Sequence, residues 1–164
     1  MEETLEKLLN IMLTENRLLE KYRDRIEELN VFIQEKDWEK IQELLGRLDL
    51  LSREIQTMDK RRDSSLMKVK ESLALPPEAP FYTVLAALSR NMDHPLAAPY
   101  RAMKNLIIQI QGILRAIEIY IRTMGESVNQ IISQFFPHQK GKIYARDGQS
   151  APVNSMPLLI NRQL

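Results

Sequence analysis

One stretch decides the architecture of this chain: residues 100–135 read YRAMKNLIIQIQGILRAIEIYIRTMGESVNQIISQF. Apolar side chains recur in it at alternating intervals of three and four residues, the spacing of one face of an α-helix. This apolar seam comprises Tyr100, Met103, Ile107, Ile110, Leu114, Ile117, Ile121, Met124, Val128, Ile131 and Phe135. Pro137 follows, and proline is poorly tolerated inside a helix. We therefore predict a long helix over about 97–136 and a flexible tail over 137–164.

The N-terminal part of the chain predicts two further long helices, over about 2–35 and 37–74. The first carries the same spacing at Leu5, Leu8, Met12, Glu15, Leu19, Tyr22, Ile26, Leu29 and Ile33. The second carries it at Trp38, Ile41, Leu45, Leu48, Ser52, Ile55, Asp59, Arg62, Leu66, Val69 and Leu73. The two series are out of phase by two residues. Insertions within a continuous coiled coil are commonly of three or four residues, so neither explains this shift.

This phase change predicts that the chain reverses near Lys36. Asp37 then stands where a helix N-cap is expected, with Glu39 in the first turn, where the helix dipole favours a carboxylate. No glycine or proline marks the turn. A single helix of about 70 residues that pairs with a second chain is the alternative that the sequence leaves open.

Prolines separate the hairpin from the last helix. All eight fall within 76–99 and 137–157, and a short helix over 81–89 fits between the prolines of the first group. The predicted fold is all-α: a long antiparallel helical hairpin plus a third long helix in one domain, residues 1–136, with the flexible tail after it.

Composition argues against several classes of function. The 23 basic and 22 acidic residues leave no global field to attract nucleic acid, and no apolar run approaches the roughly 18 residues needed to span a membrane. The N-terminus lacks the pattern of a signal peptide and the chain has no cysteine, so we expect a cytoplasmic protein. His94 and His138 have no companion ligands at helical spacing. We predict no enzyme activity, no metal and no cofactor.

Apolar residues outside the seam of the third helix are the candidate binding residues. Leu106, Ile113 and Tyr120 form a second stripe beside the seam at intervals of seven residues. Ile108 and Ile119 lie among charged and polar residues on the side expected to face water. Grouped apolar residues on a polar face often mark a partner-binding surface. These five residues are therefore the predicted residues for binding another helix. Packing of the second stripe against the hairpin is the alternative that the sequence leaves open.

The arrangement resembles the FlgN family of flagellar export chaperones over essentially the whole chain. The similar features are the hairpin with Asp37 opening its second helix, the linker at Leu75-Pro76-Pro77, the long third helix, and a tail in which Tyr144 and Gly148 form the pattern Tyr-x-x-x-Gly. This sequence differs from the family in its third helix, where Gln109 and Gln111 stand among isoleucines.

The resemblance implies a cytoplasmic chaperone that binds the C-terminal helices of the hook-filament junction proteins and delivers them to the type III export gate. It also implies that Tyr144 and Gly148 contact the cytoplasmic domain of that gate. Two alternatives stay open: an export chaperone for a different flagellar client such as the filament cap, and a structural coiled-coil homodimer. The sequence leaves the oligomeric state open between a monomer and a weak homodimer.

Overall fold

The computed structural model describes residues 2–89 and 94–135, with side chains up to residue 127. Within these ranges the chain forms four helices and no strand: α1 (Glu2–Glu35), α2 (Trp38–Ser72), α3 (Phe81–Leu88) and α4 (Ala97–Phe135). The all-α fold predicted from the sequence is confirmed. The described residues divide into two compact units, one ending at Ile113 and the other beginning at Leu114, so that α4 contributes to both. The division into a domain at 1–136 and a tail stays a prediction.

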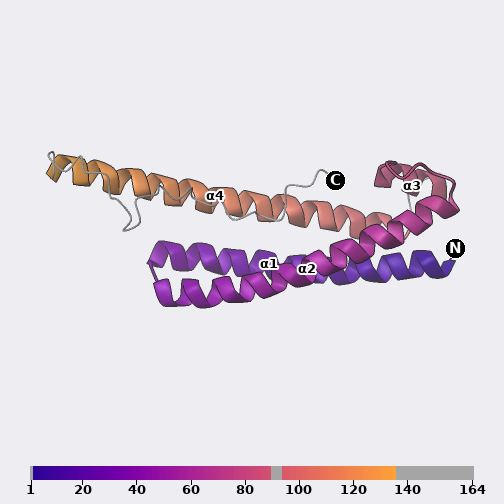
Figure 1. Ribbon diagram of the computed structural model, residues 1–164, viewed down its shortest axis with the longest axis horizontal. Helices are drawn as coiled ribbons and strands as arrows, with labels where there is room; N and C mark the ends of the chain where they lie inside the picture. Colours follow the sequence, from indigo (N-terminus) through magenta and orange to yellow (C-terminus); the bar gives the residue numbers. More distant parts are fainter. Residues whose placement is uncertain (1, 90–93, 136–164) are drawn as a thin grey trace, which may run out of the picture. The chain divides into compact units, whose positions relative to one another are not determined.

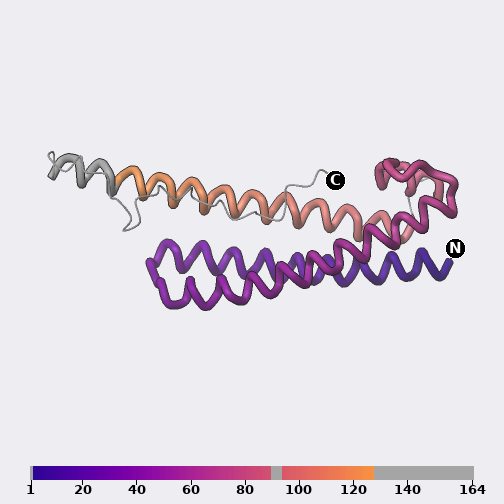
Figure 2. Tube along the Cα trace, viewed as in Figure 1, coloured from indigo at the N-terminus to yellow at the C-terminus, as the bar shows by residue number. Residues whose placement is uncertain are grey.

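Helices α1 and α2 pack side by side as an antiparallel hairpin (Figure 1). The reversal that joins them is the bend at Lys36 and Asp37 (Figure 2). The alternative of a single helix of about 70 residues is therefore wrong.

The turn at Lys36 closes without glycine. Lys36 has a φ of 59°, the left-handed conformation in which glycine is the usual residue. Its N–H donates to Ile33 O at 3.2 Å, and the N–H of Asp37 donates to Phe32 O at 3.0 Å. These two bonds satisfy the last carbonyls of α1 in the pattern of a Schellman motif. Asp37 then accepts the N–H of Lys40 through its side chain at 3.2 Å, which confirms the predicted N-cap.

Helix α2 ends in the same way. Ala74 has a φ of 54°, and the N–H of Leu75 donates to Lys70 O at 2.9 Å. The ammonium of Lys70 donates to Pro77 O at 2.6 Å, so the proline linker folds back against the end of α2. Helix α3 follows, and its Phe81 ring stacks on Tyr100 of α4 with 4.3 Å between the ring centroids.

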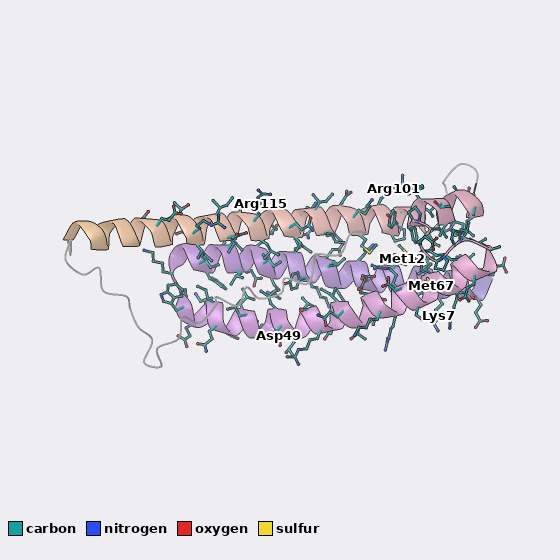
Figure 3. The ribbon with its side chains drawn as sticks, turned by 45° about the horizontal axis from the view of Figure 1, so that its top comes forward. Lys7, Met12, Asp49, Met67, Arg101 and Arg115 are labelled. Carbon is teal, nitrogen blue, oxygen red and sulfur yellow. The ribbon has the colours of Figure 1, made fainter. Side chains whose placement is uncertain are left out.

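The first turns of α4 run parallel to α1. Asn16 donates to Pro99 O at 2.9 Å, and further along both helices Arg23 donates to Gln109 Oε1 at 3.3 Å. Burial of apolar side chains from all four helices forms the core of the first unit. Its largest members with almost no exposed surface are Leu8, Met12, Ile26, Val69, Val84, Leu96, Met103 and Ile110. Figure 3 shows Met12 in this interior, whereas Asp49 extends outward from α2.

Several seam residues lie elsewhere than predicted. Trp38, the first residue of α2, is 72% exposed, and Leu45 is 41% exposed while its neighbour Leu44 is buried. In the second unit, Ile121 and Met124 are 54% and 36% exposed. None of the helices within the described ranges has the length and apolar content required to cross a membrane.

Candidate partner-binding helix

The exposed apolar residues of α4 form the candidate site. Ile108 is 64% exposed in the first unit, and Ile119 is 56% exposed in the second. They are eleven residues apart, and at about 100° per residue this spacing places them on nearly the same face of the helix. Ile113 and Tyr120, which are half-buried, are seven residues apart and share a different face.

Leu106 does not belong to this exposed set. It is only 6% exposed and lies in the core of the first unit with Met103 and Ile110. These residues recur at intervals of three and four, so the buried side of α4 in this unit passes through 103, 106 and 110. Ile107 of the predicted seam is only half-buried. A client helix cannot reach a side chain in the position of Leu106, and we therefore remove Leu106 from the predicted binding residues.

In the second unit some apolar side chains of α4 are exposed, although Ile117 is only 7% exposed. The described part of this unit is a single helix, Leu114–Phe135, and one helix alone cannot form a core. Ile119, Ile121 and Met124 are all exposed on it. Such a segment of helix is suited to pairing with another helix.

The only strongly buried ion pair among the described residues joins α1 to α2. Arg62 Nη1 donates to Glu15 Oε1 at 2.7 Å and also lies 3.0 Å from the sulfur of Met103 on α4. Arg62 Nη2 donates to the carboxylates of Asp59 and Asp63. In the sequence, Glu15 and Arg62 are polar members of two separate apolar series, and their pairing was not predicted.

Burial dominates the electrostatics of this pair. It raises the pKa of Glu15 from 4.5 to about 7, although the nearby Arg62 guanidinium acts in the opposite direction. Glu15 and Arg62 are 3% and 7% exposed, so neither can meet a substrate from solvent. The pair is therefore a structural element that connects α1, α2 and the start of α4. No group of three or more histidine, aspartate or glutamate side chains suited to a metal ion occurs in the described part of the chain.

Tyr144 and Gly148, the predicted gate-contact residues, lie outside the described residues. The contact predicted for them stays a prediction.

Fold and site together define an all-helical protein whose exposed apolar residues include a group on one long helix. Comparison with known proteins identifies its family. The sequence model described as "FlgN protein" matches residues 1–152, and the chain therefore belongs to the FlgN family, a family of flagellar export chaperones. An uncharacterized protein of Treponema pallidum (strain Nichols) is 26% identical over 121 residues, which cover 73% of this chain and 70% of that protein. No solved structure matches the chain significantly.

Proposed function

We propose that this protein is a cytoplasmic chaperone that binds the C-terminal helices of hook-filament junction proteins and delivers them to the type III flagellar export gate. The observation that carries the proposal is the exposure of Ile108 and Ile119 on α4 in a chain that belongs to the FlgN family. Ile113 and Tyr120 extend the client-binding surface on the adjoining face of α4.

Helix pairing suits this task. A client end that assembles only after export is prone to aggregate while its apolar face is exposed, and a chaperone helix that covers this face prevents aggregation. Release then requires the separation of two helices and no covalent chemistry. This mode is helix recognition through apolar anchors at helical spacing.

Replacing both exposed isoleucines tests the client surface. Ile108→Ser/Ile119→Ser should weaken binding of a junction-protein C-terminal segment by about tenfold or more, because apolar anchors at an interface each contribute on the order of 1 kcal/mol or more. The thermal melt should change little, since isoleucine and serine have similar helix propensity and exposed substitutions usually alter stability by less than about 0.5 kcal/mol. Isothermal titration calorimetry measures the affinity, and circular dichroism measures the melt.

The matched control is Leu50→Ser, which removes a 63% exposed apolar side chain from α2. It should leave client affinity unchanged. Equal affinity of the double variant and the wild type would remove Ile108 and Ile119 from the binding surface.

The proposed gate contact rests on similarity to the family's tail pattern, represented here by Tyr144 and Gly148. We expect Tyr144→Ala to abolish or strongly weaken binding to the cytoplasmic domain of the gate, because a tyrosine in a contact supplies both apolar area and a hydroxyl. Surface plasmon resonance with the immobilised gate domain measures this. Client binding measured on the same variant should be unaffected, and retention of wild-type gate affinity would contradict the assignment.

A further inference from the structure

We propose that the outer face of α4 takes an amphipathic client helix whose apolar side is flanked by acidic residues, and that this helix crosses the α4 backbone at Gly112. The inference rests on the proposed function and adds the chemistry and the place of contact. Three observations carry it: the position of Gly112 relative to two exposed isoleucines, the open space around that glycine, and basic side chains without acidic partners.

Gly112 lies on the same face of α4 as the two exposed isoleucines. Ile108 precedes it by four residues, one turn, and Ile119 follows it by seven, two turns. The buried positions Met103, Leu106 and Ile110 lie on the other side of the helix. The two isoleucines therefore flank a site on the outer face where α4 has no side chain.

The packing described does not require glycine at this position. A Cβ built on Gly112 meets no atom within 4 Å. A glycine within an exposed helix costs about 1 kcal/mol relative to alanine. What glycine offers here is close approach of another backbone, which any side chain would prevent. A crossing helix would use this space, with its own apolar side chains against Ile108 and Ile119.

The charges around this site point to an acidic partner. Arg101, Lys104 and Arg115 are exposed on α4, and Figure 3 shows Arg101 on the side of the helix away from the hairpin. Among the described residues, neither Arg101 nor Arg115 has an acidic partner, and Lys104 lies 5.3 Å from the centroid of the Tyr100 ring. Arg122, by contrast, is paired with Glu118 at 2.8 Å. Glutamates or aspartates flanking the apolar side of the client would complement the three remaining cations.

A second exposed glycine, Gly46, lacks the unpaired basic side chains that lie near Gly112. Gly46 on α2 also has open space around it, since a Cβ added there meets no atom within 4 Å. The charges near it are already paired, Glu43 with Arg47 at 2.6 Å and Asp49 with Arg53 at 2.8 Å. Gly46 is therefore a matched control for substitutions at Gly112.

The test uses the full chain and two helical peptides with identical leucine seams, one with glutamates beside the seam and one with lysines there. The wild type should bind the glutamate peptide at least about tenfold more tightly than the lysine peptide, and added salt should reduce the difference. Gly112→Leu should raise the melting temperature, since leucine is a better helix former, and should still lose about tenfold or more in affinity. Gly46→Leu should raise the melting temperature with affinity unchanged.

Arg115→Glu provides a second variant that does not depend on steric blockage. It should narrow or reverse the preference for the glutamate peptide, whereas Lys68→Glu on the exposed surface of α2 should not. Equal binding of the two peptides by the wild type, absence of binding to both, or full affinity in Gly112→Leu would each overturn the inference. Binding of the junction-protein segments is measured separately and tests the proposed function. Failure of the inference can therefore be distinguished from failure of the proposed function.

Discussion

Arg62→Met is expected to lower the free energy of unfolding by about 3–5 kcal/mol, equivalent to a fall in Tm of roughly 10 °C or more. The substitution keeps a long unbranched side chain but removes the cation beside Glu15, which is only 3% exposed. Without the cation, nothing offsets the hydration free energy that the carboxylate lost when it was buried. Urea denaturation at pH 8 measures the loss.

The pH dependence identifies Glu15 as the source of the effect. The folded protein binds the Glu15 proton more tightly than the unfolded chain does, because its pKa is raised from 4.5 to about 7. The stability that this group contributes is therefore fully present below pH 4.5 and is lost as the pH rises through about 7. We expect Arg62→Met to cost less at pH 5 than at pH 8, since the carboxyl is then protonated.

The double variant Glu15→Leu/Arg62→Met is the control for this prediction. Replacing both members of a buried pair with apolar residues is often neutral or stabilising, so it should recover most of the loss. Equal destabilisation by Arg62→Met at both pH values, or no recovery in the double variant, would contradict the role assigned to the pair.

Leu106→Ala is expected to cost about 2–5 kcal/mol, the range for large-to-small substitutions in a packed core. Ile108→Ala, two residues away, should cost less than about 0.5 kcal/mol, because that side chain is 64% exposed. Chemical denaturation of the two variants measures the contrast.

The effects of the two substitutions on client affinity should have the opposite order to their effects on stability. Folded Leu106→Ala should bind as the wild type does, and Ile108→Ala should bind more weakly. Similar destabilisation by both substitutions would contradict the assignment of Leu106 to the core and Ile108 to the surface.

The hairpin could be predicted from sequence because its signals are local. The change of phase after Ile33 and the capping residue Asp37 lie within a few positions of each other, and together they place the reversal correctly. The left-handed conformation of Lys36 was not predictable, since lysine carries no preference for it.

The candidate site was only partly predictable because exposure depends on what each helix packs against. A repeat of three and four residues allows either Leu106 or Ile107 on the buried side of α4, and in the folded protein Leu106 is the one that is buried. The pairing of Glu15 with Arg62 joins residues 47 positions apart, which periodicity does not encode. Ile108 and Ile119 were identified correctly as exposed because they interrupt a polar face.

Light scattering most directly tests the central claim, which is that this protein binds the C-terminal helices of hook-filament junction proteins. The full chain is measured alone and mixed with the C-terminal segment of each of the two hook-filament junction proteins from the same organism. A one-to-one complex with either segment is the predicted result. Absence of a complex with both, together with a stable elongated homodimer whose mass does not change when a segment is added, would contradict the chaperone proposal and favour a structural coiled coil.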